Sequence, residues 1–394
     1  MARTKMELAG GVRLADAVTL GALASHVPIQ EVRAAIKEAG REGVRNRLLT
    51  SELTMLFVIA MSLYRDVSYV EVLRCLFEGF RRFGNSLSRV IPTKGAVTQA
   101  RDRLGFEAVQ GLFRRIARPM ADKKAKGAWY RGLRTVALDG STLDVYDSPS
   151  NVAAFGYPPA SRGNSAFPKI KFVALCETGT HAAFACEMGS YTVGEAELSL
   201  NLFESLKPGM LLLADRGFLS YELWDKARAT GADLLWRVSS TWTLSAREML
   251  GDGSWIARIR PQTGKRRTER EIAVRVVEYS IEGSAESYRL VTTLLAPEEA
   301  PAEELAALYH ERWEVESMFD EMKTHLKGSR VVLRSKTPDL VRQEFWGMML
   351  AHRALRELMY EAAFEKGWDP DVISTVHAIR LVRRTMASAA ALPP

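Results

Sequence analysis

The first third of the chain has the hydrophobic pattern of helices. From about residue 27 to 120, apolar residues recur every three or four positions, as on the buried face of an amphipathic helix. TSELTMLFVIAMSLY at 50–64 places hydroxyl residues directly before an apolar run, which marks a helix start. VSYVEVLRCLFEGFRRF at 67–83 has the same spacing. We therefore predict an all-helical N-terminal domain over residues 1–125.

One helix of this region carries polar residues suited to DNA. In VIPTKGAVTQARDRLG, Pro92 and Thr93 are expected to start a helix that continues to Leu104. Its polar side chains suit contacts with phosphates and base edges, and it fits the second helix of a helix-turn-helix. A surface helix with ordinary charges explains the same pattern equally well. The polar residues are Lys94, Gln99, Arg101 and Arg103.

The pattern changes after ADKKAKGAWYRG, which is typical of a linker. Short runs of aliphatic and β-branched residues bounded by glycine follow, as in buried strands, and two segments between them have helical spacing. Strands interrupted by helices of this length predict an α/β sheet covered by helices. The expected strands are 133–140, 169–179, 181–191 and 209–218, and the expected helices are 194–209 and 220–232.

A second strand-rich region extends from about 237 to 295. RRTEREIAVRVVEYSI at 266–281 and SYRLVTTLLA at 287–296 have the composition of strands, and a basic loop, KRRTER, lies at 265–270. A β-rich segment at 237–300 is therefore expected to interrupt the α/β region.

The segment YHERWEVESMFDEMK at 309–323 carries two stripes if it forms one regular helix. At about 100° of rotation per residue, four polar residues lie within about 60° of one another. Four apolar residues beside them form a stripe that would face a core. The polar stripe is Tyr309, Arg312, Glu316 and Lys323, and the apolar stripe is Val315, Met318, Phe319 and Met322.

The bulk composition is that of a globular protein. The 394 residues are 47% hydrophobic and 26% charged, which is enough for a large core and more than one domain. Cys75, Cys176 and Cys186 have no metal-ligand spacing, so we expect buried thiols in a reducing compartment. The N-terminal 28 residues lack an uninterrupted signal-peptide core, and the longest apolar run, 55–64, is too short for a bilayer. A cytoplasmic protein is expected.

The positive charge is concentrated at one end. Net charge is +7, yet residues 1–130 hold 22 Lys and Arg against 12 Asp and Glu, which leaves the remainder slightly acidic. A basic, helical third joined to an acidic remainder favours a module that binds a polyanion, attached to a region that needs carboxylates. Charge alone does not distinguish a nucleic-acid surface from a solvated basic face.

Two carboxylates stand at expected strand ends. Asp139 follows TVAL and Asp215 follows MLLLA, and ligands collect at the carboxyl ends of strands in open α/β sheets. Glu316 on the polar stripe offers a third acid. A turn or cap role explains a single such Asp, and physics alone does not select Glu316 over Asp320. Three converging carboxylates would need a divalent cation, and oxygen ligands favour Mg²⁺ or Mn²⁺.

The sequence resembles a known family. The segment at 309–323 matches the signature Y-x2-R-x3-E-x6-K of DDE-type transposases from bacterial insertion sequences, in the insertion-element-four group. Further matching pieces occur in the same order from about residue 30 to 385. They are TKGAVTQARDRLG, VALDGSTLDV, KPGMLLLADRGFLSYELW, TGADLLWRV and LRSKTPDLVRQEFWGMMLAHRALRELM.

This resemblance implies a fold and an activity. The implied catalytic core is ribonuclease-H-like, with Asp139 ending the first strand, Asp215 the fourth and Glu316 on a late helix. The implied reaction is cut-and-paste transposition: metal-dependent cleavage at terminal inverted repeats and strand transfer to target DNA, with two Mg²⁺ or Mn²⁺ ions and a DNA-bound synaptic dimer. The expected divisions are 1–125 for DNA binding, 126–236 and 301–394 for the core, and 237–300 for the insertion.

The resemblance also implies DNA contacts near the acids. Tyr309, Arg312, Lys323 and Arg216 are expected to meet phosphates. Without the resemblance, ion pairs of Arg312 and Lys323 with acids such as Glu316 or Asp320 on a solvated helix face are the simpler interpretation. Some relatives form hairpin ends with an aromatic that stacks a flipped base, and Tyr288 stands at that position. The alternatives there are a cross-strand packing role, or Trp242 and Trp255 as the stacking residue. Two other functions remain open: a transposase-derived DNA-binding protein without catalysis, and an unrelated Mg²⁺-dependent nuclease or phosphatase.

Overall fold

The computed structural model divides the chain into two compact units, each described here by itself. The first comprises residues 1–118, 143–170 and 319–394, and the second comprises 119–142 and 171–318. The N-terminal segment and the basic loop KRRTER lie outside the described residues. The described residues are 26–43, 48–65, 67–82, 91–160, 163–261, 271–280, 287–328 and 332–388.

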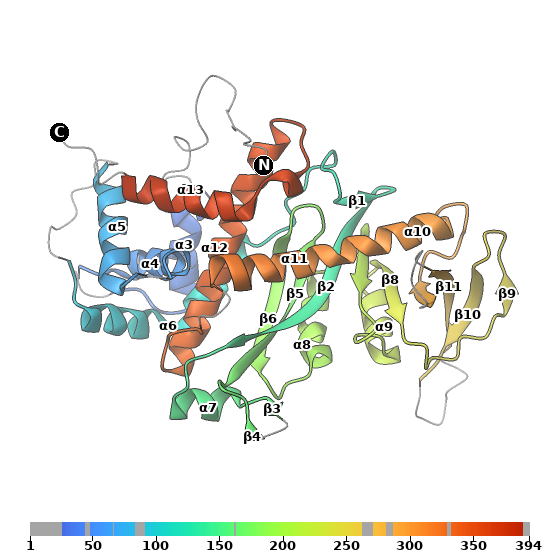
Figure 1. Cartoon of the computed structure of the whole chain (residues 1–394), viewed down its shortest axis with the longest axis horizontal. Helices are drawn as coiled ribbons and strands as arrows, with labels where there is room; N and C mark the ends of the chain where they lie inside the picture. The colour runs from blue at the N-terminus through green and yellow to red at the C-terminus, as the bar shows by residue number, and fades with distance from the viewer. Residues whose placement is uncertain are drawn as a thin grey trace. The chain divides into compact units, whose positions relative to one another are not determined.

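The first unit is built mainly of helices (Figure 1). The long helix α12, Pro338–Phe364, packs against α4, Ser51–Leu63, and α6, Lys94–Ile116. Both expected caps are present, since Thr50 and Thr93 each accept a hydrogen bond from a backbone N–H three residues later. The other elements of the unit are α3 Ile29–Glu38, α5 Tyr69–Arg82, α7 Pro149–Phe155, the hairpin β3 Pro159–Ala160 and β4 Gly163–Asn164, η4 Pro370–Val372 and α13 Thr375–Ser388.

The N-terminal helices share this unit with the C-terminal ones. Among the described residues the first strand begins at Trp129. The predicted boundary at 125 does not separate a compact unit, because α4 and α6 bury their faces against α12. Gly105 has φ 70° and breaks α6 after Leu104, where the sequence predicted the helix to end.

The second unit is built on a ten-stranded sheet, whose main path runs in the order β6-β5-β2-β7-β8-β12-β11-β10-β9. β2 pairs with β7 and β7 with β8 in parallel, and β12 then adds antiparallel to β8. The strand-rich region predicted at 237–300 therefore extends the core sheet. The bounds are β1 Trp129–Tyr130, β2 Leu133–Asp144, β5 Lys169–Glu177, β6 Ala182–Ser190, β7 Met210–Ala214, β8 Asp233–Val238, β9 Glu248–Met249, β10 Trp255–Ile259, β11 Ile272–Ser280 and β12 Ser287–Thr292.

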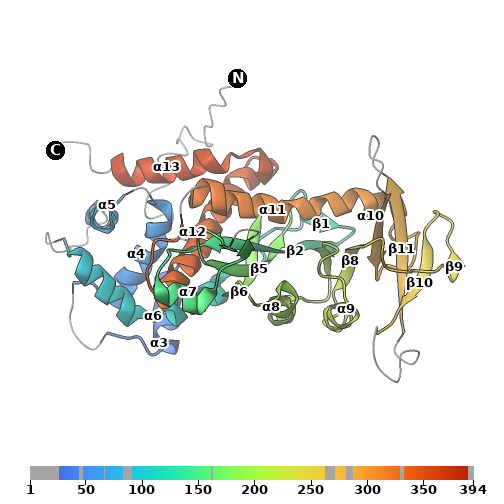
Figure 2. The same ribbon diagram turned by 60° about the horizontal axis from the view of Figure 1, so that its bottom comes forward.

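Alternation along the strands decides what each face of the sheet packs against. Leu212 and Ala214 join the core under α8, Glu195–Leu202, and α9, Tyr221–Arg228. The intervening Leu213 joins a second core under α10, Ala302–Tyr309. Figure 2 shows α8 and α9 on one side of the sheet and α10 on the other. A 3₁₀ turn, η1 Phe203–Ser205, ends α8.

Two details differ from the sequence predictions. β2 does not end at Asp139 but continues to Asp144, although its pairing with β7 stops at Leu138. The segment 309–323 is not one regular helix: after α10 come a 3₁₀ turn, η2 His310–Arg312, then α11 Trp313–Asp320, then a π-helical turn, η3 Glu321–Leu326. Since 3₁₀ and π turns rotate by other angles than an α-helix, the predicted stripe is not continuous.

The burial predicted for the cysteines agrees with the structure. All three cysteines are buried thiols. Within the described ranges, no helix has the length and hydropathy needed to cross a bilayer.

Candidate active site

The sheet register brings Asp139 and Asp215 together. Leu138 of β2 pairs with Ala214 of β7, so the next residue on each chain is one of the two acids. Neighbouring strands lie about 4.8 Å apart, and Leu138 and Ala214 both face α8 and α9. Asp139 and Asp215 therefore stand side by side at the same level of the sheet, and Arg312, which follows α10, reaches Asp139 from the face that α10 covers.

Glu316 reaches this face from α11, and Arg312 links it to the sheet. Arg312 donates from Nη1 to Asp139 Oδ2 at 3.3 Å and from Nη2 to Glu316 Oε1 at 2.9 Å. Its side chain is 6% exposed, whereas that of Glu316 is 40% exposed. The ion pair considered as the simpler interpretation is thus present, and this guanidinium neutralises part of the repulsion between the two acids.

Tyr309 does not present its phenol to solvent. The side chain is 5% exposed, and its hydroxyl donates to the backbone carbonyl of Ala214 at 3.1 Å. Burial raises the pKa of this phenol well above its usual range. The predicted phosphate contact by Tyr309 is therefore wrong for this structure: the hydroxyl fixes the end of α10 to the strand that leads into Asp215.

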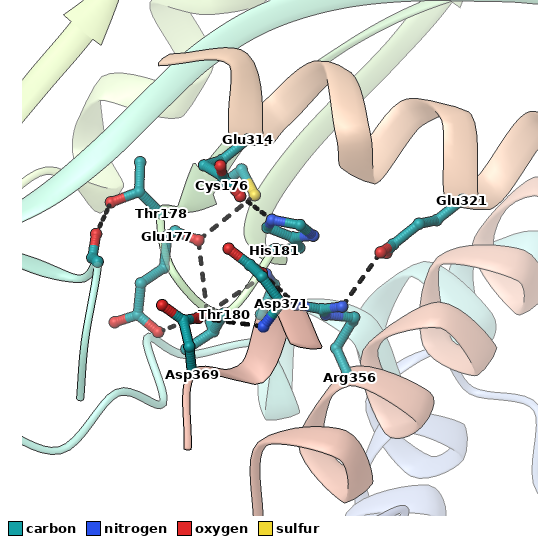
Figure 3. A network of polar contacts seen from close by, with 12 residues as sticks. Cys176, Glu177, Thr178, Thr180, His181, Glu314, Glu321, Arg356, Asp369 and Asp371 are labelled. Atoms are coloured by element: carbon teal, nitrogen blue, oxygen red, sulfur yellow. Dashed lines mark hydrogen bonds and ion pairs between the residues drawn. The ribbon is translucent and has the colours of Figure 1, made fainter. Parts of the chain in front are cut away.

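A second contact, missed by the sequence analysis, holds the start of α11. His181, in the turn between β5 and β6, forms a side-chain hydrogen bond with Glu314, two residues before Glu316 (Figure 3). In the same turn, Thr180 donates to Glu177 at 2.8 Å. A lone His and a surface Glu give no recognisable sequence signal. These contacts position α11, and with it Glu316, on the sheet. Lys323 belongs to the other compact unit, so its predicted DNA contact remains a prediction.

The donor set fits a divalent cation. Asp215 Oδ1 is buried and has no hydrogen-bond partner among the described residues, a costly state for a carboxylate oxygen unless it binds an ion. Asp139 uses one oxygen to accept from the Gly140 N–H at 2.7 Å. Burial raises the pKa of Asp139 to about 6, opposed by Gly140 and Arg312, and the negative charges of Glu316 and Glu195 add to the rise. Hard oxygen ligands and excess negative charge suit Mg²⁺ or Mn²⁺.

The pKa of Asp139 sets a pH dependence for metal binding. A proton and a cation compete for this carboxylate, so we expect Mn²⁺ affinity to fall about tenfold per pH unit below about pH 6. Titration of the full chain with Mn²⁺, followed by electron paramagnetic resonance at several pH values, measures the slope. Asp225→Asn on α9 should keep the slope and Asp139→Asn should remove it. Equal wild-type affinity at pH 5 and pH 7 would contradict the expectation.

The polar residues predicted on α6 divide into two groups. Lys94, Gln99 and Arg103 are exposed, as a DNA-contacting surface requires. Arg101 is 1% exposed and donates to Gln343, Ser335 and the carbonyl of Leu340. The predicted DNA contact by Arg101 is therefore wrong. Its guanidinium joins α6 to the start of α12, a role that helical spacing does not reveal.

The other predicted DNA residues lie in the sheet unit. Arg216 is exposed directly after Asp215. Tyr288 faces Tyr279 across the β11–β12 pair, with stacked rings 5.5 Å apart, and Arg237 lies 4.5 Å from its ring centroid. The cross-strand packing considered as an alternative is thus present. Tyr288 shares the face of Leu290, which packs under α10, so it lies on the same side of the sheet as the acids.

Trp242 lines a pocket instead. The pocket has a volume of about 480 Å³, and Arg247, Arg258 and Arg260 also line it. Glu271 pairs with Arg258 and Arg260. Trp255 donates to the carbonyl of Leu244 and is half-buried. Of the two competitors, Trp242 has the surroundings that suit an unpaired nucleotide.

The chain is similar in sequence to known transposases. The family described as insertion element 4 transposase N-terminal matches residues 17–114, and the transposase DDE domain matches 130–353. Transposase InsG for insertion sequence element IS4 of Escherichia coli K12 is 29% identical over 377 residues, covering 93% of this chain and 83% of that protein. Putative transposase InsZ of the same organism is 27% identical over 233 residues, covering 59% and 75%.

A solved structure shares the fold. The piggyBac transposase, determined as a synaptic complex with hairpin DNA, has a TM-score of 0.50 at 12% identity, over 95% of this chain and 82% of that one. This likeness supports the predicted mixed α/β core. Because the DDE domain family alone matches more than half of the chain, this protein belongs to the DDE transposases of the insertion-element-four group.

Proposed function

We propose that this DNA transposase performs its reactions at Asp139, Asp215 and Glu316 of a ribonuclease-H-like core. Its family membership makes it an enzyme of DNA cleavage and strand transfer that depends on a divalent metal. The assignment rests on one observation: Asp139 and Asp215 directly follow two residues that pair with each other on adjacent parallel strands. Arg312 donates to both Asp139 and Glu316 and so links the third acid to them. The buried, unpaired Oδ1 of Asp215 supports it.

The protein's own residues would bind the metal ions and orient the DNA. Asp139, between the other two acids, would contact both ions, with Asp215 holding one and Glu316 the other. Two Mg²⁺ or Mn²⁺ ions would supply nucleophile activation and stabilisation of the leaving oxygen, so no covalent protein intermediate is required. Arg312 keeps Asp139 and Glu316 close when no metal is bound. Arg216, exposed beside Asp215, is placed to meet a DNA phosphate.

DNA recognition is assigned to the exposed face of α6. Lys94, Gln99 and Arg103 would contact terminal inverted repeats, and two protein–DNA complexes would pair in a synaptic dimer before target DNA is joined. The piggyBac relative was solved as a synaptic complex, which supports the pairing. With DNA as the proposed substrate, we infer a bacterial cytoplasmic protein that associates with the nucleoid. A DNA-binding protein without catalysis would gain nothing from a buried, unpaired carboxylate oxygen at Asp215.

Cleavage of the element's own ends tests the function. Full-length protein, Mg²⁺ and a duplex bearing the inverted repeat that flanks the gene should yield nicked ends, followed by hairpinned ends on denaturing gels. If a flipped base stacks on Tyr288, Tyr288→Ala should lower the hairpin fraction at an unchanged rate of the first nick. Trp242→Ala is the matched comparison, and a selective effect there would assign the base to its pocket instead. Equal cleavage of duplexes without the repeat would favour an unrelated nuclease.

A further inference from the structure

A fourth carboxylate lies beside the three predicted acids. Glu195 is the first residue of α8, which covers the opposite face of the sheet from α10 (Figure 2). A Cβ built on Gly140 would lie 2.6 Å from Glu195 Cδ and 2.8 Å from its Oε1. The Glu195 carboxylate therefore lies directly on the strand at the residue that follows Asp139.

This carboxylate is not used by the fold. Within the described ranges, no side chain or backbone N–H donates to it, and the Ser199 hydroxyl donates to the backbone carbonyl of Glu195 instead of to its carboxylate. Its charge acts on Asp139, because Glu195 is among the groups that raise the pKa of that acid. Two nearby negative charges without a cation between them are electrostatically unfavourable. The arrangement needs an explanation beyond packing.

A favourable interaction with the helix dipole is the simplest alternative. Acids in the first turn of a helix are stabilising, and α8 has two, Glu195 and Glu197. Glu197 is exposed in the same turn and provides that interaction as well. The dipole therefore does not account for the contact between Glu195 and Gly140. A glycine at 140, where any side chain would displace the carboxylate, makes room for this approach.

We infer that Glu195 is a fourth carboxylate of the metal site, which holds the divalent cation at Asp139 directly or through water. The inference rests on the proposed function, since it takes Asp139 as a metal ligand. Carboxylates that support a first set of metal ligands commonly change metal affinity by about 10- to 100-fold when they are replaced. Glu195 approaches from the α8 face, so it restrains the cation from the side that Arg312 and Glu316 do not cover.

Mn²⁺ binding to the full-length protein tests the inference without DNA or catalysis. Glu195→Gln should weaken Mn²⁺ binding by about 10- to 100-fold, measured by electron paramagnetic resonance or calorimetry. Glu197→Gln, on the same helical turn, should bind Mn²⁺ with wild-type affinity. Wild-type affinity in Glu195→Gln would overturn the inference. Wild-type affinity in Asp139→Asn would instead overturn the proposed metal site itself, so the two failures are distinguishable.

Gly140→Ala provides a second variant that keeps the charge of Glu195. Its backbone does not have the left-handed φ that favours glycine, so alanine fits the strand, and its Cβ pushes the Glu195 carboxylate away. Mn²⁺ affinity should fall as in Glu195→Gln, with an unchanged circular dichroism spectrum. The double variant Glu195→Gln with Gly140→Ala should have the same Mn²⁺ affinity as whichever single variant binds Mn²⁺ more weakly, because both changes act through one carboxylate. Additive losses would show that Glu195 and Gly140 act separately.

Discussion

Replacing Asp215 by Asn should lower the rate of DNA end cleavage by at least about 1000-fold. The substitution keeps the shape of the side chain but removes the charge that a divalent cation needs, and metal-ion catalysis supplies several kcal/mol of transition-state stabilisation. Binding of the DNA ends should stay within about twofold of wild type, because phosphate contacts by basic residues dominate affinity. Rates on a labelled inverted-repeat duplex with Mg²⁺ and with Mn²⁺ provide the measurement.

The design of the Asp215 experiment separates catalysis from folding. Asp225→Asn removes a half-buried carboxylate of α9, which pairs with Arg228 in the same unit, and should cleave at the wild-type rate. Asp139→Asn and Glu316→Gln should reproduce the loss seen in Asp215→Asn, since removing any one ligand disables the site. Because Asp215 Oδ1 has no partner among the described residues, the amide should also leave the unfolding midpoint unchanged or raise it. Cleavage within tenfold of wild type in Asp215→Asn would refute the assignment.

The two strand acids could be predicted because local chemistry specifies them. A buried apolar run followed by Asp, with Gly one or two residues later, indicates both a strand and the level at which the carboxylate leaves it. In the structure the register places Asp139 and Asp215 at one level, although β2 itself continues to Asp144. The sequence pattern could not show where pairing ends within a longer strand, because that depends on the partner strand.

The contacts around Glu316 could not be predicted in the same way. The predicted polar stripe assumed the same rotation per residue along the whole segment 309–323. The 3₁₀ turn η2 and the π-helical turn η3 rotate by different angles. The resulting stripe grouped Tyr309 with Arg312. In the structure Tyr309 donates to a backbone carbonyl, whereas Arg312 donates to two carboxylates. Glu195 carried no signal, because acids in a first helical turn are common. Its significance depends on Gly140, 55 positions earlier in the chain.

Arg101→Ala should destabilise the helical unit by about 3 kcal/mol, a structural effect instead of the local loss of DNA contact that the sequence predicted. The guanidinium donates to Gln343, Ser335 and the carbonyl of Leu340 while 1% exposed, and alanine would leave those acceptors unpaired in a dry interior. Burial alone would raise the pKa of Glu344, and Arg65 and then Arg101 help to lower it. The midpoint of urea unfolding of the full-length protein measures the change.

Lys94→Ala is the matched control for Arg101→Ala on the same helix. Lys94 is exposed at the first position of α6, so its loss should change stability by no more than about 0.5 kcal/mol. It should weaken binding of the DNA ends and lower the salt slope of binding by about one unit, as the removal of a phosphate contact does. If Arg101→Ala unfolded like wild type and lost end binding like Lys94→Ala, Arg101 would have to leave its buried site to reach DNA. Loss of stability in Arg101→Ala together with loss of end binding in Lys94→Ala would establish different roles for two residues that lie two turns apart on α6. Lys94 would contact DNA, and Arg101 would stabilise the packing of α6 against α12.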